Sequence, residues 1–421
     1  MTRIETLNAD VARRLEALDA RAWRRLAFAG GALALALRLL VIYLDRGRGG
    51  ADLRQYVYFG DLVLHGHNAY VLPAGAPIDP IHANNQPLEL GLFAALLAIH
   101  DGANSIRIGL AVIDAAIVPL IALAWTTRSR TWRAGICFFL AFNPFTVIGW
   151  TAFAEDKPLL LLFTALVILS VERDSWPTAW AGATMLAALK WVSIFFGLPL
   201  LIETARRVPR RTLLIIVGVC ALAFIATELP LLPDDLKAYS RRDSRIDLNP
   251  PIHASITQLL SRIGLYSPVI VRPFIVISLL VIYWLWWRKR LTLPETVVLS
   301  LLAGEVALPN QSTDRVLQIA IPLLFVIRLS LARWVVIWVI SVLSAIVLYI
   351  QTRGSPRLTK IFGVEGDLKH VIAMNVLLVL LFVWFVLDKH ATRRRGAAAG
   401  SAPPPRPAGR PRWRPWPTTT P

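Results

Sequence analysis

The chain is poor in the residues on which soluble and disulfide-stabilised proteins rely. Only 17% of its 421 residues are charged and only 27 are acidic, whereas an ordinary soluble domain carries about 25% charged residues. The two cysteines, Cys137 and Cys220, both lie within apolar runs, which excludes a disulfide framework and a cysteine-rich metal site. The first 25 residues are charged and polar, unlike a signal peptide, so we expect no cleavage there.

Apolar residues, in contrast, are abundant and gather into long runs. They make up 56% of the sequence, and the mean hydropathy is +0.56, which is more apolar surface than one or two soluble cores could bury. A membrane-spanning helix needs about 20 apolar residues. Runs near this length lie at 25–44, 105–127, 134–152, 158–172, 178–204, 212–232, 268–287, 294–309, 316–330, 333–350 and 369–388. The pattern predicts an all-α polytopic membrane protein and excludes a soluble or disordered chain.

Basic residues outnumber acidic ones by 45 to 27 and form short clusters between the apolar runs. The clusters are Arg13, Arg14, Arg21, Arg24 and Arg25; Arg128, Arg130 and Arg133; Arg206, Arg207, Arg210 and Arg211; Arg288, Lys289 and Arg290; and the C-terminal tail. Such clusters are typical of cytoplasmic loops. Their positions therefore favour a membrane topology over nucleic-acid binding.

One threading places every basic cluster on the cytoplasmic side. It has about twelve crossings with both termini cytoplasmic, and the apolar stretch 87–100 lies on the outer membrane surface. The run 178–204 then crosses twice, as two short halves that meet near Lys190, an arrangement that requires a buried or cavity-lining junction. The alternative is one long helix over 178–204, which would place the arginine cluster at 128–133 outside.

This threading divides the chain into four parts. They are a cytoplasmic N-terminus at 1–24, a catalytic module at 25–204 with a large outer loop at 45–104 that carries juxtamembrane helices, a second membrane module at 205–390 with outer loops at 233–267 and 351–368, and a disordered basic cytoplasmic tail at 391–421.

The first candidate for chemistry is Asp52, which lies just outside the first crossing. A carboxylate there can take a proton from a sugar hydroxyl while a lipid-linked donor lies alongside. However, Asp52 follows the pair Gly49-Gly50, and an aspartate after glycines is also typical of a turn or a helix N-cap. The catalytic interpretation therefore needs partners on the same face.

Three partners are expected on that face. Glu155 and Asp156 lie at the outer mouth of two helices, where they either face Asp52, to orient an acceptor or help to hold a divalent cation, or only complement a helix dipole. Two acids alone are a weak metal site. Lys190 lies inside an apolar run, where a charge is costly and points to function. It either binds a lipid phosphate or snorkels to the head groups.

Two further cations and a histidine are expected on the outer side. Arg107 and Arg315 could each clamp a phosphate through two hydrogen bonds, or serve as an interfacial anchor and as a partner of Asp314, respectively. His253 lies in a loop rich in arginine, which suits an anionic lipid head group, although a loop histidine is more often a surface residue.

These residues, in this order, resemble the GT-C superfamily of integral membrane glycosyltransferases. The nearest branch is the bacterial polyprenyl-phosphate-mannose-dependent mannosyltransferases. The matching elements are Asp52, Tyr56 and Gly66-His67-Asn68-Ala69-Tyr70; Asn84-Asn85-Gln86-Pro87-Leu88-Glu89, without the family's Tyr and one of its prolines; Asn143-Pro144; Glu155-Asp156; and Lys190. They cover roughly residues 25–205.

The resemblance implies inverting transfer of a sugar, mannose first, from a polyprenyl phosphate to a lipid or glycan acceptor at the outer face of the cell membrane. Asp52 would be the base, with Glu155 and Asp156 beside it. Lys190 and an arginine would hold the donor phosphate, and Tyr56, Asn68 and Tyr70 would contact substrate. No cofactor is required, although some relatives use a divalent cation.

Two other functions are compatible with many helices and membrane cations. A transporter or flippase of an anionic lipid-linked sugar often has two related halves with matching broken helices, whereas here only the first half is predicted to have a break. A noncatalytic membrane scaffold would have no use for Asp52, Asp156 and Lys190 at one level.

Overall fold

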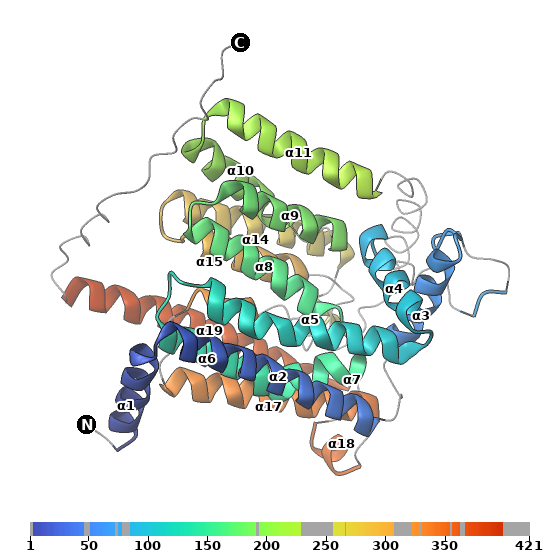
Figure 1. The fold of residues 1–421 in the computed structure, drawn as a ribbon, viewed down its shortest axis with the longest axis horizontal. Coiled ribbons are helices and arrows are strands. Elements are labelled where there is room, and N and C mark those ends of the chain that lie inside the picture. The colour runs from blue at the N-terminus through green and yellow to red at the C-terminus, as the bar shows by residue number, and fades with distance from the viewer. Residues whose placement is uncertain are drawn as a thin grey trace.

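The computed structural model is helical throughout the part of the chain that it describes. That part comprises residues 3–45, 51–71, 75–77, 85–190, 193–228, 256–265, 267–306, 321–327, 331–353, 356–362 and 367–398. The helices form a bundle whose long elements run roughly side by side (Figure 1). The predicted all-α class is confirmed.

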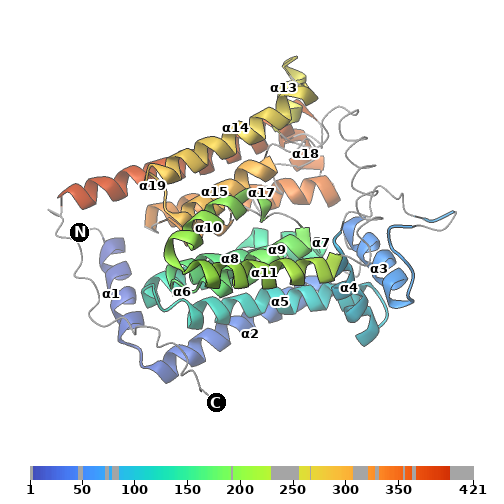
Figure 2. The same ribbon diagram turned by 90° about the horizontal axis from the view of Figure 1, so that it is seen from above.

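The bundle has two layers, which Figure 2 shows edge-on. The first layer contains α2 (Ala20–Asp45), α5 (Ala103–Ala124), α6 (Arg130–Phe142), α8 (Lys157–Glu172), α9 (Trp176–Lys190) and α11 (Arg210–Glu228). The second contains α14 (Pro268–Trp287), α15 (Leu293–Val306), α17 (Leu331–Arg353) and α19 (Leu368–Ala398). α10 (Ile194–Arg207) packs on α15 and joins the layers.

Shorter elements lie at the ends of the bundle or between the layers. They are α1 (Arg3–Ala17), α3 (Ala51–Leu64), α4 (Pro87–Ile99), the π-helix η2 (Phe145–Trp150), α7 (Thr151–Phe153), α13 (Ile256–Arg262), the 3-10 helix η3 (Ile321–Phe325) and α18 (Pro356–Phe362). Figure 1 places α1 at one end of the bundle and the pair α3–α4 at the other.

Within the described ranges, four helices are long and apolar enough to cross a membrane. They are Ala20–Asp45, Ala103–Ala124, Arg210–Glu228 and the Val371–His390 part of α19. Many of their large apolar side chains are exposed on the outside of the bundle, as expected of surfaces that face lipid. The membrane assignment is thus supported, and the number of twelve crossings stays a prediction.

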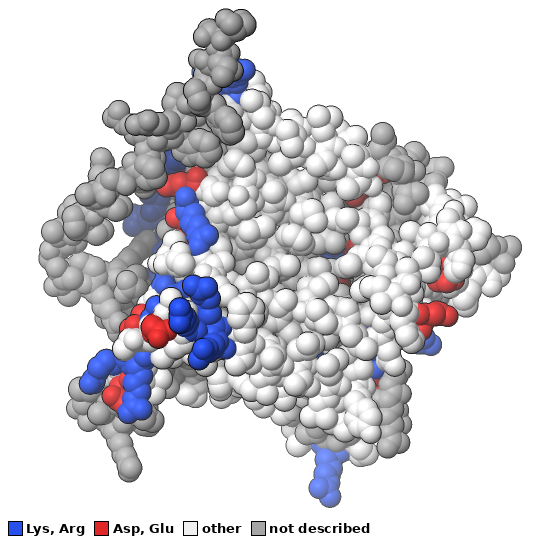
Figure 3. Space-filling model, in the orientation of Figure 1, with Lys and Arg blue, Asp and Glu red and all other residues white. Residues whose placement is uncertain are grey.

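The charged side chains divide the molecule along the bundle axis. In Figure 3, Lys and Arg gather at the end that carries α1, and a broad uncharged band follows. Several basic clusters meet at this end. Arg130 donates hydrogen bonds to the carbonyls of Glu16 and Leu18, which lie beside the N-terminal cluster. The guanidinium of Arg206 stacks on Trp286 and Trp287, next to the cluster at 288–290. This is the distribution that the positive-inside rule predicts for one face of a membrane protein.

Two apolar runs are interrupted. The break expected near Lys190 is confirmed, since α9 ends at Lys190 and α10 begins at Ile194. The single helix expected over 134–152 is wrong: α6 stops at Phe142, and η2 and α7 follow. Pro144 causes the stop, because it has no N–H to bond to the carbonyl one turn earlier. At the other end of the chain, α19 continues as a helix to Ala398, into the predicted tail.

Helices α2 and α5 are antiparallel neighbours joined by two reciprocal ion pairs. Arg38 of α2 pairs with Asp114 of α5, and Asp45 of α2 pairs with Arg107 of α5 at 2.8 Å. The partners on each helix are seven residues apart, so both pairs lie on the same face, two helical turns from each other. Because both arginines are buried, these pairs fix the register of the two helices.

Close contact between α2 and α5 also depends on a glycine. A methyl group added at Gly31 would lie 2.9 Å from Cδ of Pro119, whereas one at Gly30 would lie 3.6 Å from the Val118 side chain. We predict that Gly31→Ala lowers the free energy of unfolding by about 1–3 kcal/mol through overpacking. The matched variant Gly30→Ala should be neutral or gain up to about 1 kcal/mol of helix propensity. Denaturant titration in detergent, followed by tryptophan fluorescence, measures both; equal effects would contradict this packing.

Candidate active site

Helices α3 and α4 form a platform at the end of the bundle opposite α1. Pro87 occupies the first turn of α4, where its missing N–H costs no hydrogen bond. The rings of Tyr56 in α3 and Phe93 in α4 stack with centroids 4.3 Å apart, and Gly60 lets α3 approach the backbone of Phe93 closely. Two helices are thus present within the segment 45–104, and they share an apolar core with the first turns of α5. Their placement in an outer loop at the membrane surface stays a prediction.

A tight turn presents two carboxylates beside this platform. Ala154 ends α7 in the left-handed conformation with φ 56°, and the backbone N–H of Glu155 donates to the carbonyl of Trp150 at 2.9 Å. Asp156 then occupies the N-cap position of α8, with Pro158 in its first turn as predicted. The turn directs Glu155 and Asp156 into the protein, where both are buried.

Two lysines compensate the buried Asp156 carboxylate. The Lys157 Nζ atom lies 2.7 Å from Oδ1 of Asp156 and 3.6 Å from Oε2 of Glu155. Lys190, at the end of α9, forms an ion pair with the other oxygen of Asp156. The predicted convergence of Asp156 and Lys190 is therefore seen in the structure, and Lys157 is a member of the cluster that the sequence did not assign a role.

Glu89 is a second site residue that the sequence analysis did not identify. It is fully buried in the first turn of α4, and its side chain faces Asp156 and Asn85. Burial and the nearby Asp156 carboxylate raise the pKa of Glu89 well above its usual range. Burial alone would raise the pKa of Asp156 as well, but the ammonium groups of Lys157 and Lys190 hold that pKa well below its usual range. We therefore expect Glu89 to keep its proton at neutral pH and to share it with the Asp156 carboxylate.

Tyr56 connects this buried cluster to Asp52. Both residues lie on α3, one turn apart, and Tyr56 is buried while Asp52 is partly exposed. Burial, followed by the carboxylates of Asp156, Asp52, Glu155 and Glu89, raises the pKa of Tyr56 well above its usual range. The phenol therefore stays neutral. Asp52 contributes to this shift from one turn away on α3, and its role as the base stays a prediction.

The exposed fraction of the side chain differs between the members of this cluster. The Lys190 side chain is 26% exposed, whereas the Asp156 side chain is only 2% exposed. Lys190 and Asp52 are thus partly exposed charged residues, whereas Asp156 is buried. The arrangement offers a carboxylate to accept a proton and an ammonium group to compensate an anion, and these are the two functions that transfer from a phosphate ester requires.

The remaining predicted site residues have other surroundings. Asn68 accepts a hydrogen bond from the N–H of Tyr70 at 2.9 Å, and the Tyr70 hydroxyl donates to the carbonyl of Asn85. They therefore support the segment that leads to Glu89. Arg107 pairs with Asp45, and its role as a phosphate clamp stays a prediction. Arg315 and His253 lie outside the described residues.

The chain matches no family model, no curated protein and no solved structure. The search for three or more grouped His, Cys, Asp or Glu side chains able to hold a metal ion finds none within the described ranges.

The proton on Glu89 should make the stability of the protein depend on pH. Glu89 has an ordinary pKa of 4.5 when unfolded and a raised one when folded, so its stabilising contribution is complete below pH 4.5 and is lost as the pH rises through the folded value. Glu89→Gln mimics the protonated acid and removes this loss. We predict that wild type loses more stability than Glu89→Gln between about pH 5 and pH 9, measured by thermal unfolding in detergent.

The control is Asp101→Asn, which neutralises an exposed carboxylate at the same end of the bundle and should leave the wild-type profile unchanged. Infrared difference spectra provide a second readout, because Glu89→Gln should remove the carbonyl band of a protonated carboxyl group. Parallel pH profiles together with an unchanged band would show that Glu89 is ionised.

Proposed function

We propose that this chain is an integral membrane glycosyltransferase of the inverting type. It would move a hexose, mannose by the nearest resemblance, from a polyprenyl phosphate to a lipid or glycan acceptor. The observation that carries the proposal is the cluster at one end of the bundle, in which the partly exposed Lys190 side chain pairs with the buried Asp156. Asp52 lies one helical turn from Tyr56, and the carboxylates of Asp156 and Asp52 both act on the Tyr56 phenol.

The position of this cluster supports a reaction at the outer membrane surface. Figures 1 and 3 place the platform of α3 and α4 at the end opposite the arginine-rich end. If the basic end is cytoplasmic, as the positive-inside rule indicates, the site faces the outside of the cell membrane. A lipid-linked donor can then diffuse to the site within the bilayer while its sugar phosphate remains in the head-group region.

Each side chain has one role in the proposed reaction. The Asp52 carboxylate accepts the proton of an acceptor hydroxyl, and the freed oxygen attacks the anomeric carbon as the bond to the phosphate oxygen breaks. The leaving group is polyprenyl phosphate, and the Lys190 ammonium compensates its developing negative charge. Asp156 is too buried to touch substrate, so its role is to hold Lys190 in place. Glu155 shares this positioning role through Lys157.

One observation favours the second candidate, a transporter of an anionic lipid-linked sugar. The helix discontinuity lies between the end of α9 at Lys190 and the start of α10 at Ile194, and transporters often bind substrates at such broken helices. The same cation would then bind a phosphate in transit. The two candidates differ in whether a covalent bond is made, so one assay can separate them.

The decisive variant is Asp52→Asn, with Asp61→Asn as its matched control. Both aspartates lie on α3, but Asp61 is exposed and pairs with His65 at 3.2 Å. We predict that Asp52→Asn lowers transfer about 100- to 10,000-fold, the usual contribution of a general base, and that Asp61→Asn retains full activity. The assay follows label from polyprenyl phosphate mannose into a membrane lipid extract, using purified protein in liposomes.

Two other results would contradict the proposal. If Asp52→Asn transfers as well as wild type, the base is misassigned. If wild type transfers from none of the polyprenyl phosphate sugars tested but moves them between leaflets, the transporter is the correct function.

A further inference from the structure

An ion pair lies deep within the bundle, away from the candidate active site. Arg38 and Asp114 belong to the candidate spans α2 and α5, and both are buried, Arg38 completely. Charges inside a membrane domain are costly and usually have a function. The reciprocal pair of Asp45 with Arg107 already fixes the register of these helices, so register alone does not explain why Arg38 is present.

The contacts of Arg38 point to the broken end of α6. At a regular helix end, the carbonyls of Leu140 and Ala141 would accept from residues 144 and 145. Pro144 has no N–H, and the N–H of Phe145 donates instead to Oδ1 of Asn143 at 2.9 Å. Both carbonyls thus lose their helical donors while buried in the bundle.

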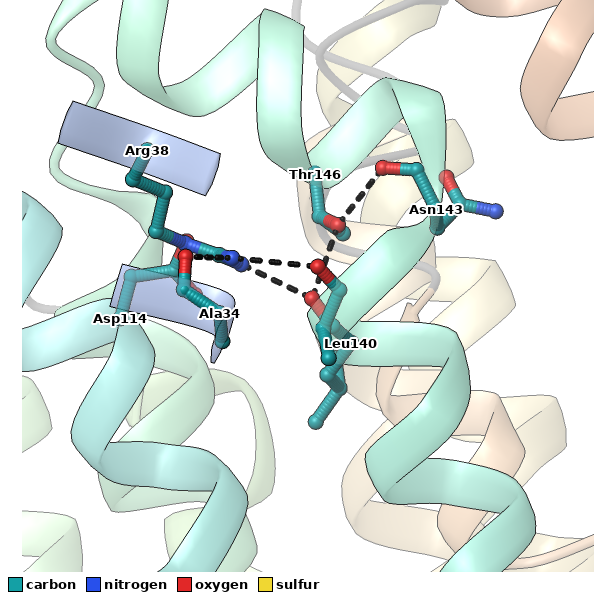
Figure 4. Close-up of polar contacts among 7 residues, drawn as sticks. Ala34, Arg38, Asp114, Leu140, Asn143 and Thr146 are labelled. Carbon is teal, nitrogen blue, oxygen red and sulfur yellow. Dashed lines mark hydrogen bonds and ion pairs between the residues drawn. The ribbon is translucent and has the colours of Figure 1, made fainter. Parts of the chain in front are cut away.

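The Arg38 guanidinium replaces these two donors, as Figure 4 shows. Its Nη2 donates to the carbonyl of Leu140 at 2.8 Å, and its Nη1 donates to the carbonyl of Ala141 at 3.3 Å. Nη1 also bonds the carbonyl of Ala34 in its own helix at 3.0 Å, and Nε bonds Asp114. The planar guanidinium fork therefore connects α2, α5 and α6 at the residue pair where α6 stops.

A threonine strengthens the same junction from the other side. The hydroxyl of Thr146, in η2, lies 3.2 Å from the Leu140 carbonyl and 3.0 Å from the Asn143 carbonyl. Thr146 lies only ten positions before Asp156. The residues between them form the rest of η2, α7 and the turn at Ala154, and α2 packs against both helices. The start of this short segment is held by Arg38, and its end carries the site carboxylates.

We propose that Arg38, oriented by Asp114, is a positioning residue for the active site. By holding the broken end of α6, it sets where η2 and α7 begin and hence where Asp156 meets Lys190. This inference rests on the proposed function for its catalytic consequence. A lysine at position 38 could keep the ion pair with Asp114, but its single nitrogen could not also reach both α6 carbonyls.

The main test compares Arg38→Lys and Thr146→Val with a matched control. Thr146→Val preserves shape and leaves every charge in place, so it keeps the test valid if Arg38→Lys fails to fold. The control, Glu172→Gln, breaks the partly exposed ion pair of Arg128 with Glu172, which lies at the end of α8 away from the carboxylate turn. It tests whether the loss of an ion pair elsewhere in the bundle has the same effect.

Two readouts are taken in the same detergent. Amide hydrogen exchange should become faster in residues 143–157 for Arg38→Lys and, more weakly, for Thr146→Val, and should be unchanged there for Glu172→Gln. The kcat for transfer should fall about 10- to 100-fold in Arg38→Lys and about fivefold in Thr146→Val. The KM for the acceptor should stay the same in each variant.

The outcomes separate this inference from the proposed function. Unchanged exchange in 143–157 overturns the inference whatever the activity, and faster exchange with unchanged kcat shows that Arg38 is structural only, which also overturns it. If wild type transfers no sugar, the proposed function fails, whereas faster exchange confined to 143–157 would still support the inference that Arg38 positions the carboxylate turn.

Discussion

The buried carboxylate of Asp156 is the constraint from which the candidate site follows. An uncompensated charge at 2% exposure would cost several kcal/mol, so opposite charges must surround it. Lys157 comes from the same turn, but Lys190 must come from the far end of α9, and Glu89 enters from α4 with its proton retained. The buried Asp156 carboxylate is thus surrounded by side chains from three separate segments of the chain. The consequence for chemistry is that the buried Asp156 carboxylate fixes the position of the partly exposed Lys190 side chain.

A second buried ion pair, Arg38 with Asp114, lies within the candidate spans α2 and α5. Arg38 compensates Asp114 and also supplies the donors that Pro144 removes from the end of α6. A proline break inside an apolar bundle would otherwise leave carbonyls without partners. The chain therefore combines an irregular backbone element, the π-helix after the break, with hydrogen bonds from Arg38 and Thr146 that hold the end of α6 before it. Such π-helical segments are frequent at functional sites.

Sequence patterns predicted the parts of this structure that depend on local chemistry. The break near Lys190 could be predicted because a lysine is costly in the middle of an apolar run. The start of a helix at Pro158 could be predicted because proline suits a first helical turn. The break after Phe142 was missed, although Asn143-Pro144 is a typical helix-ending pair, since the surrounding run 134–152 is largely apolar and of membrane-spanning length. Glu89 and the partner of Arg107 were missed for a different reason. The raised pKa of Glu89 depends on the packing of α3 on α4, and the pairing of Arg107 depends on the packing of α2 on α5. No local sequence pattern specifies either contact.

A double-mutant cycle on Asp156 and Lys190 tests the central claim most directly. The free energy of unfolding is measured in detergent for Asp156→Asn, Lys190→Gln and the double variant. If the two groups form one buried pair, each single change should cost about 3–5 kcal/mol, and the double change should cost no more than the larger of them. Additive losses would show that Asp156 and Lys190 act independently, and the site as described would then not exist.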